Sequence, residues 1–533
     1  MKKLCFICLI SLVFFGCEDF LDKTDPTATS FDEFFNDEDD LRRVVYSSFT
    51  DVWTNSGNRR MLFYMLDGRS DNAYARLEGD HHQLIANGNI SSNTPAFEYY
   101  YALHMKHLGR LNTFIANAHI PYVENEAART KYVNNLEALR IWHYFQLVFS
   151  WGDVPFYLEP ATIADATQPA TPGEEILDII FPLALEIAEE LPEEEYSSDK
   201  FMFNQYSLKA LVMRYALYFE RYQLAADLAK EIMDSGRYSL HPNYAELFQY
   251  DADDSNNEFI MVQDMSSHSG GTYSFRDMGP HYRTGPGQSY IVPLKSLVDS
   301  YWTLQGRSIE EDEMFSKAEY EVDPNLNRDP RYEASIMGQG DIFYEDEIDV
   351  YNANSPMFYE LDRASASGYW FRKFVDEDDA FKPTNGGSME FPLLRYAEVL
   401  LTYAEAKLML NQFDAEAKDA INQVRERAGL DMTQADVTSP YYADYSQEDW
   451  IQLVRNERRI ELAADGLRYD DIIRWRIAEE VLNGPVWGDT RMVDGELQSL
   501  FVEERTFQPH NYLWPFHEST LKVEPGLTQN PGY

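Results

Sequence analysis

The sequence predicts a mainly α-helical fold in which helical hairpins frame a loop-rich α+β subdomain. Apolar residues recur at spacings of three and four in paired stretches joined by short turns, which is typical of helical hairpins rather than of an alternating α/β sheet. Between about residues 238 and 392 this periodicity is lost, and Gly, Pro, Asp, Asn and Tyr become frequent. At 533 residues the chain is also long enough to form two or more packed subregions.

The chain begins with a predicted export signal. Two lysines precede a hydrophobic run of twelve residues, 4–15, and Gly16 and Cys17 follow it. The run is too short to span a bilayer, which takes about 20 residues, but it suits the core of a signal peptide. All three cysteines lie within the first 17 residues, so Cys17 has no disulfide partner in the mature chain. We expect a lipoprotein signal peptide over 1–16 and a tether over 17–40, lipidated at Cys17; the alternative is an ordinary secretory signal with an incidental cysteine.

N-terminal helical-hairpin repeats are predicted over residues 41–237. Four stretches in this range carry apolar residues at helical spacing, and Gly236 can end the last of them in a left-handed conformation. The stretches are 97–115 with 128–149, and 206–219 with 224–233.

The remaining chain is predicted to contain a loop-rich ligand-binding subdomain, 238–392, and C-terminal helical hairpins with a docked tail, 393–533. Short β-like runs such as 259–262 interrupt the loops, and a loop region of this length is usually functional. In the C-terminal part, residues 393–410 are apolar over a wide arc, which predicts a buried helix. Asp414 can cap the next helix, which Gly429 can end, and 450–463 predicts one more. These hairpins resemble tetratricopeptide-type repeats in their length and small residues.

The charge balance argues against polyanionic partners. The chain has 45 basic and 90 acidic residues, a formal charge of −45 that becomes −47 when Lys2 and Lys3 leave with the signal peptide. Long-range repulsion therefore disfavours nucleic acid, and it argues mildly against sulfated or uronic-acid polymers.

No catalytic, metal or cofactor site is predicted. The histidines, including His104, His107 and His143, show no metal spacing with a third ligand, and His143 fits a core position. The acidic cluster between Asp251 and Glu258 lacks the glycine and spacing of a calcium loop, which favours a solvated turn. Candidate carboxylate pairs for a glycosidase are so abundant in this chain that they identify no site.

A run of charged residues near the C-terminus predicts ion pairs. Carboxylates and guanidiniums recur there at spacings of three and four on one helix, so that they can meet along its face. An anion site is the functional alternative, but nothing Gly-rich or phosphate-cradling accompanies the run, and we favour a partly buried ion-pair lattice. The residues are Arg455, Glu457, Arg458, Arg459 and Glu461, followed by Arg468, Asp470 and Asp471.

Segments in a fixed order along the chain resemble the SusD/RagB family over essentially the whole mature sequence. This resemblance implies a mostly helical SusD-like fold with four tetratricopeptide-like hairpins and a loop-rich ligand surface. It also implies an outer-membrane, cell-surface lipoprotein that binds glycans without cleaving them and covers a SusC-like TonB-dependent transporter. The segments begin at Cys17-Glu18-Asp19-Phe20, Trp151-Gly152-Asp153-Val154-Pro155, Gly368-Tyr369-Trp370-Phe371, Arg395-Tyr396-Ala397-Glu398, Asn422-Gln423-Val424-Arg425, Glu457-Arg458-Arg459-Ile460, Leu513-Trp514-Pro515 and Asn530-Pro531-Gly532-Tyr533.

Two loop segments combine rings with polar side chains, as sugar recognition requires. Sugars stack their C–H faces on aromatic rings, while amides, carboxylates and arginines bind the hydroxyls. The resemblance places glycan contacts near the first segment, and the rings of the second lie among glycines, which form a poor core. For each single ring, packing within the core or a loop remains an equal alternative. The candidates are Asp71, Asn72, Tyr74, Arg76 and Phe97 in the first segment, and Tyr273, Phe275, His281, Tyr282 and Tyr290 in the second.

The preferred interpretation is a non-enzymatic, lipid-anchored protein that captures oligosaccharides for uptake. Oligopeptide or glycoprotein-glycan capture on the same scaffold is the first alternative. A surface glycoside hydrolase and a pure interaction scaffold are the others; the Tyr- and Gly-rich loops argue against the scaffold.

Overall fold

The computed structural model describes residues 35–53, 63–77, 80–196, 200–252, 256–263, 274–281, 287–312, 323, 325–382 and 387–533. The predicted signal peptide, Cys17 and most of the predicted tether lie outside these residues. Phe35 is buried in the main hydrophobic core, so the chain has joined the folded body before the first described helix begins at Glu38. None of the described helices is long and apolar enough to cross a membrane.

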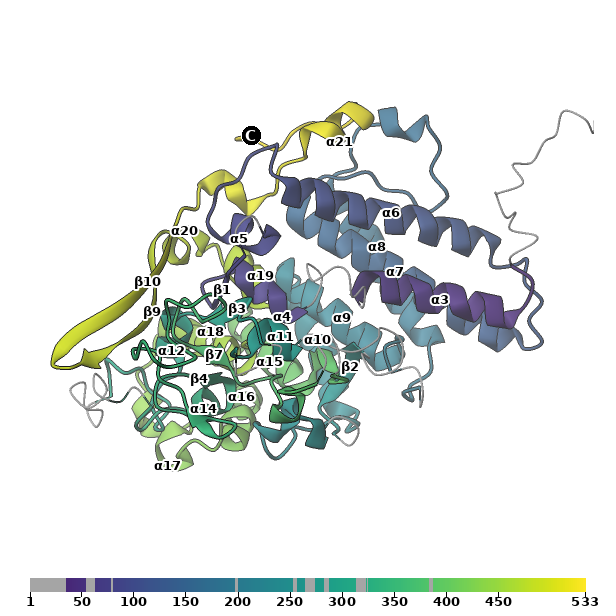
Figure 1. Cartoon of the computed structure of the whole chain (residues 1–533). Helices are drawn as coiled ribbons and strands as arrows, with labels where there is room; N and C mark the ends of the chain where they lie inside the picture. Colours follow the sequence, from purple (N-terminus) through teal and green to yellow (C-terminus); the bar gives the residue numbers. More distant parts are fainter. Residues whose placement is uncertain are drawn as a thin grey trace, which may run out of the picture.

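Long helices form the N-terminal part, where α6 packs on α7, α7 on α8 and α8 on α9 (Figure 1). Local sequence determines where they begin: Asn125 accepts a hydrogen bond from the Ala127 amide at the start of α7, and Asn204 and Ser207 form a capping box at α9. The four helices predicted here are confirmed as α6, α7, α9 and α10, whereas α3, α4, α5 and α8 were not predicted. The bounds are α3 Glu38–Trp53, α4 Phe63–Leu66, α5 His81–Ala86, α6 Pro95–Asn117, α7 Glu126–Trp151, α8 Gly173–Glu190, α9 Gln205–Tyr218 and α10 Tyr222–Asp234.

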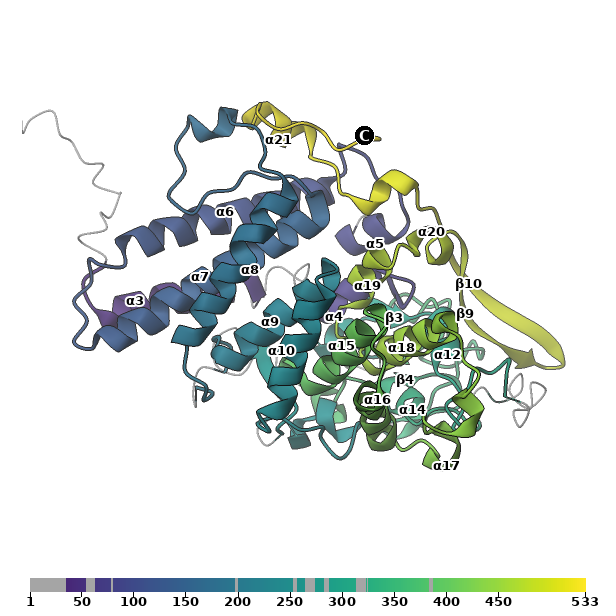
Figure 2. The same ribbon diagram turned by 180° about the vertical axis from the view of Figure 1, so that it is seen from behind.

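The C-terminal helices continue this array, because α10 packs against both α9 and α15 (Figure 2). Helix α15 is buried on almost every side, as its wide apolar arc predicts. The predicted cap and stop of α16 are confirmed: Asp414 accepts from the Ala417 amide, and Gly429 has a φ of 84°. The bounds are α15 Tyr396–Met409, α16 Ala415–Ala428, α17 Met432–Ala435, α18 Gln447–Glu461, α19 Arg468–Arg474, α20 Ala478–Val481 and α21 Glu518–Val523.

Between the two helical groups lies the predicted loop-rich region, built from short helices and two-stranded antiparallel sheets. It has its own hydrophobic core, which includes Trp370, Phe371 and Phe391. Trp370 is fully buried in this core. The pairs are β1 with β3, β2 with β8, β4 with β7 and β5 with β6. The bounds are β1 Ala73–Ala75, β2 Phe259–Gln263, α11 Ser274–Met278, β3 Ile291–Pro293, α12 Lys295–Ser300, α14 Arg331–Ser335, β4 Ile336–Met337, β5 Ile342–Phe343, β6 Asp346–Glu347, β7 Trp370–Phe371 and β8 Phe391–Arg395.

A long β-hairpin, β9 Gly484–Val493 and β10 Glu496–Arg505, projects from the body (Figure 1). Asp494 and Gly495 connect its strands, both with positive φ, as a tight hairpin turn requires. One face of the hairpin packs inward through Asp489 and Leu500, and the opposite face exposes apolar side chains. This hairpin was not predicted, although the Asp-Gly pair between alternating residues is a strong hairpin signal.

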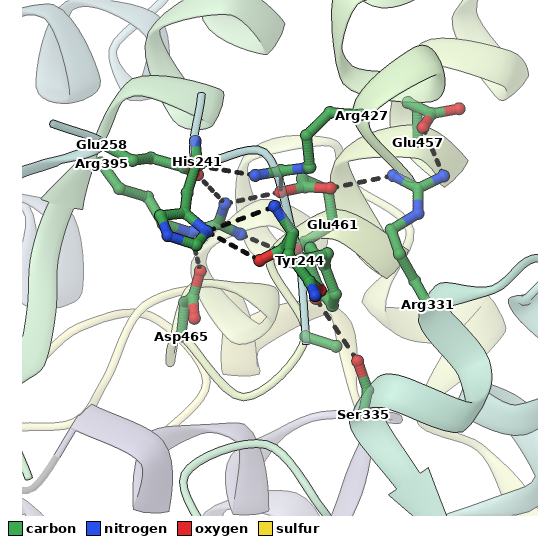
Figure 3. A network of polar contacts seen from close by, with 12 residues as sticks. His241, Tyr244, Glu258, Arg331, Ser335, Arg395, Arg427, Glu457, Glu461 and Asp465 are labelled. Carbon is green, nitrogen blue, oxygen red and sulfur yellow. Dashed lines mark hydrogen bonds and ion pairs between the residues drawn. The ribbon is translucent and has the colours of Figure 1, made fainter. Parts of the chain in front are cut away.

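Buried ion pairs join the loop-rich region to the C-terminal helices (Figure 3). Arg395 lies 2.6 Å from Glu461 and 2.7 Å from Asp465, and Arg331 lies 2.9 Å from the other oxygen of Glu461. Burial alone would raise the pKa of Glu461, but Arg427, Arg395 and Arg331 lower it well below its usual value. The predicted ion-pair lattice is therefore confirmed around Glu461.

Glu258 corrects one detail of the sequence analysis. This last residue of the acidic cluster is fully buried, with its carboxylate 2.9 Å from Arg395 and 2.6 Å from Arg427. The solvated turn predicted for the cluster is wrong at this position, because two arginines distant in sequence compensate for the burial of the charge. Within the described residues, no three His, Cys, Asp or Glu side chains are grouped as metal ligands would be.

Candidate ligand-binding site

The two segments predicted to carry the ligand surface meet in an antiparallel strand pair. Strand β1 comes from the first segment, and β3 directly follows the second. The register places Tyr74 opposite Val292 and Ala75 opposite Ile291, and the Arg76 amide donates to the Tyr290 carbonyl at 2.8 Å. A ladder of three residue pairs thus joins parts of the chain that are more than 200 residues apart.

Three of the predicted site residues lie on one face of this ladder. Side chains two apart on a strand point to the same side, so Tyr74 and Arg76 share a face with Tyr290, which lies opposite Arg76. The Arg76 guanidinium lies 5.3 Å from the centre of the Tyr290 ring, within the range of a cation–π contact. Tyr74 and Tyr290 are both partly exposed. This face therefore presents two rings and a guanidinium together.

Arg76 is held in place by two polar contacts and still has N–H donors for a ligand. Its Nη2 donates to the Gln288 carbonyl at 2.9 Å, and its Nη1 lies 3.3 Å from Asp362, whose side chain is 87% exposed. A guanidinium carries five N–H donors, so these contacts leave donors for sugar hydroxyls. The exposed Asp362 carboxylate adds an acceptor beside the ring.

Tyr74 supplies a neutral hydroxyl at this face. Gln83 on α5 donates to its oxygen at 3.4 Å. Burial and then the Glu503 carboxylate raise the pKa of Tyr74 above its ordinary value, so the phenol stays protonated at neutral pH. Tyr74 can therefore donate as well as accept.

In the second segment, Arg276 is the residue whose contact with this face is described, and Phe275 and His281 have other neighbours. Phe275 is buried in α11 beside Phe343. Its neighbour Arg276 pairs with Asp277 at 2.7 Å and lies 5.9 Å from the Tyr290 ring centre. His281 is half-buried, with its Nδ1 3.0 Å from the Gly287 carbonyl. Tyr273 and Tyr282 lie outside the described residues, and their proposed role stays a prediction.

Three members of the first segment are placed in the interior. Phe97 has no exposed surface and packs 5.3 Å from the ring of Trp514, because it lies on the inward side of α6. Asp71 and Asn72 are also buried, and their oxygens accept hydrogen bonds from Arg468 and Arg459 respectively. We therefore leave Phe97 out of the proposed contact surface, and we assign Asp71 and Asn72 to holding the loop before β1.

A pocket of about 290 Å³ lies at the other end of the same strand pair, between α12 and β9. Trp487 on β9 lines it with a side chain that is 40% exposed, and Phe501 packs edge-on to this indole at 5.5 Å. Lys295, paired with Asp299 at 2.7 Å, lines the same pocket. We call this the Trp487 pocket. Sequence reasoning missed it because the hairpin that carries Trp487 was not predicted.

A family model described as the SusD family matches residues 248–533. A SusD-like protein of Formosa agariphila is 26% identical, and the alignment covers 99% of this chain and 98% of that protein. Among solved structures, a SusD-like carbohydrate-binding protein of Bacteroides fragilis superposes with a TM-score of 0.81 at 24% identity, over 93% of this chain and 100% of that one. A laminarin-binding SusD-like protein superposes with a TM-score of 0.70 at 21% identity, over 94% and 100% of the chains.

Proposed function

Because this chain belongs to the SusD family, we propose that it binds glycans at the cell surface and delivers them to a SusC-like TonB-dependent transporter in the outer membrane. The observation that carries the proposal is the face formed by Tyr74, Arg76 and Tyr290 on the β1–β3 ladder. Partly exposed rings can stack on the C–H face of a sugar, and the guanidinium beside them can bind hydroxyls. The names of the solved relatives, one carbohydrate-binding and one laminarin-binding, support this ligand class.

The anchor and the location belong to the same proposal. Acylation at Cys17 would hold the protein on the membrane after residues 1–16 are removed. Localisation to the outer membrane surface follows from the family and from this predicted anchor.

The protein is proposed to bind glycans without hydrolysing them. Glycosidases need two carboxyl groups, one of them a general acid with a raised pKa. The carboxylates placed at the face and its pocket have other partners: Asp362 pairs with Arg76, Asp299 with Lys295, and Asp71 with Arg468.

A binding screen of the purified mature protein tests the proposal. Neutral and acidic polysaccharides would be compared with oligopeptides by affinity electrophoresis and calorimetry, and bound oligosaccharides would be analysed for chain length afterwards. We expect binding of at least one glycan with unchanged chain length. Binding of peptides alone would contradict the proposal, and steady release of shorter products would make the protein a hydrolase.

Transfer to the transporter requires a separate measurement. The outer-membrane proteins of the native organism would be solubilised and purified on the tagged mature protein. Recovery of a TonB-dependent transporter supports the partnership, and its absence after chemical cross-linking in intact cells would contradict it.

A further inference from the structure

Three arginines line a second pocket, of about 200 Å³, between α18, α19 and α20. Arg455 and Arg459 come from α18, and Arg468 comes from the first turn of α19. We call this the arginine pocket. Val481 lines both this pocket and the Trp487 pocket, so the two are neighbours.

Two of these arginines share a single carboxylate. Asp71 receives two hydrogen bonds from Arg468, and its Oδ2 also lies 2.9 Å from Nη2 of Arg459. One carboxylate is thus shared by two guanidiniums, and the charges of Asp299 and Asp67 also act on Arg459. Burial lowers the pKa of Arg459 to about 10, although Asp71 acts to raise it. Among the described residues, Asp71 is the only carboxylate that forms an ion pair with either arginine.

Arg455 has fewer carboxylate partners than Arg459 or Arg468. Among the described residues it forms no ion pair, and its guanidinium lies 4.8 Å from the indole of Trp475. The nearby carboxylate of Glu405 is engaged by both Nη atoms of Arg474 and by the Trp475 indole N–H. Burial lowers the pKa of Arg455 below its ordinary value. Its guanidinium thus lies against an aromatic ring, and none of the described carboxylates is within ion-pair distance of it.

The lining of the pocket adds only one further charge, the exposed carboxylate of Glu480. The lining itself therefore holds three guanidiniums and one carboxylate, with Asp71 outside the lining shared by two of the arginines, on a protein whose formal charge is −45. A guanidinium matches the geometry of a carboxylate or a sulfate, to which it can donate two parallel hydrogen bonds.

We propose that the arginine pocket binds an anionic substituent of a glycan, a sulfate ester or a carboxylate, while neutral parts of the same glycan lie in the Trp487 pocket. This proposal rests on the proposed glycan-binding function. The repulsion expected from the overall charge acts at long range and is screened beyond about 8 Å at physiological ionic strength. At contact, the local arginines determine the sign of the interaction.

Matched ligands and one conservative variant test the proposal. Sulfated oligosaccharides would be compared with their desulfated forms, and uronate oligosaccharides with their carboxyl-reduced forms, by isothermal calorimetry. Inorganic sulfate and glucuronate would serve as small probes, with chloride at equal ionic strength as the reference. The variant is Arg455→Gln, because Arg459 and Arg468 hold the buried Asp71. Arg476→Gln is the control, since Arg476 is an exposed arginine just after α19 that does not line the pocket.

We expect Arg455→Gln to weaken binding of the charged ligands about tenfold, the effect of losing one charge-assisted contact, and to leave neutral ligands unchanged. Arg476→Gln should bind like the parent, and both variants should keep the parent's melting temperature. Arg455→Lys, which keeps the charge but not the planar fork, should restore part of the affinity. A preference for sulfate esters or for carboxylates identifies which anion the pocket accepts.

The proposal is overturned if charged and neutral partners bind equally, or if Arg455→Gln binds the charged ligands like the parent. If Arg455→Gln melts early, the Arg455→Lys variant is used in its place. The proposal is then overturned if the folded Arg455→Lys variant keeps the specificity of the parent and the parent binds neither sulfate nor glucuronate. The small probes distinguish a failure of the arginine-pocket proposal from a failure of the proposed function. Glucuronate binding without any glycan binding would contradict only the proposed function, whereas neutral glycan binding without any anion preference would contradict only the arginine pocket.

Discussion

Arg468 on α19 binds Asp71 through two parallel hydrogen bonds, Nε to Oδ1 at 2.7 Å and Nη2 to Oδ2 at 2.9 Å. The two residues are 397 positions apart, so this contact fastens the loop before β1 to the C-terminal helices. Burial alone would raise the pKa of Asp71, but Arg459 and Arg468 lower it below its usual value. The strand that carries Tyr74 is thus positioned by a buried ion pair.

Asp71→Asn should destabilise the fold. The substitution leaves the two buried arginines, Arg459 and Arg468, without their shared counter-charge, and breaking a buried pair in this way costs about 3–5 kcal/mol. Urea unfolding at neutral pH measures the loss. Asp362→Asn is the matched control, because Asp362 also pairs with an arginine but is exposed, and its variant should remain within about 1 kcal/mol of the parent. Equal stability of Asp71→Asn and the parent would refute the structural role assigned to Asp71.

Tyr290→Ala and Tyr74→Ala should weaken glycan binding and leave the scaffold folded. By analogy with rings that stack on bases, each loss is about 1–3 kcal/mol, or roughly ten- to hundredfold in affinity. Phe97→Ala should behave differently, because removing a buried ring costs about 3–5 kcal/mol of stability. Affinity and melting temperature are measured for all three variants. If both tyrosine variants bind like the parent, the ligand face lies elsewhere.

Trp487→Ala should reduce glycan affinity if the pocket beside β9 holds a sugar. The expected loss is about 1–3 kcal/mol, by the same stacking analogy. Met492→Ala is the control, because Met492 lies on the same strand and is also 40% exposed but does not line the pocket. Calorimetry with one confirmed glycan compares the two variants; a loss in Met492→Ala as large as that in Trp487→Ala would indicate a general effect on the hairpin.

Stability should fall with acidification because of His104. This side chain is buried with its Nδ1 2.9 Å from Nδ1 of His143, and burial followed by His107 and Arg69 lowers its pKa from 6.5 to about 3. The unfolded chain therefore binds the proton first as pH falls, so the contribution is present above pH 6.5 and is lost between pH 6.5 and about 3. Between pH 6.5 and 5 the loss is about 2 kcal/mol.

Urea unfolding at pH 7.5, 6.5 and 5.0 checks this prediction through the difference between parent and variant. His104→Asn should show a shallower fall in stability over this range than the parent. The exposed His119 supplies the control, since His119→Asn should follow the parent. A parallel pH profile for His104→Asn would show that another group is responsible.

Labelling with a fatty-acid analogue tests the predicted anchor. The mature protein should carry the label, and Cys17→Ala should lose it, because Cys17 directly follows Gly16 and no other cysteine remains after cleavage. Persistent labelling of Cys17→Ala would contradict lipidation at this residue.

Local features of the fold could be predicted from the sequence, and long-range ones could not. The cap at Asp414 and the stop at Gly429 depend on neighbouring residues, so both were predictable. The pairing of β1 with β3 joins two strands of three residues, and nothing in either sequence indicates the other strand as its partner. Which of the two alternatives held for Phe97, core packing or exposure, could not be predicted, because the side of a helix that becomes buried depends on what packs against it.

The site shows the same limit. That Tyr74, Arg76 and Tyr290 would be polar-site candidates follows from their residue types, but their shared face follows from the register alone. The charged run on α18 predicts ion pairs correctly at Glu461. That Arg455 forms no ion pair among the described residues could be seen only in the structure, because it depends on the position of every neighbour. Trp487 could have been found earlier from the Asp494-Gly495 turn signal.

The ladder between β1 and β3 and its attachment to Arg468 also constrain the order of assembly. Residues made early, near 74, cannot adopt their final geometry until the chain near 291 is present, and Asp71 gains both of its arginine partners only after residue 468 has been made. Contacts this distant in sequence carry a large loop-closure entropy and slow folding. The proposed ligand face should therefore be among the last parts of the molecule to form.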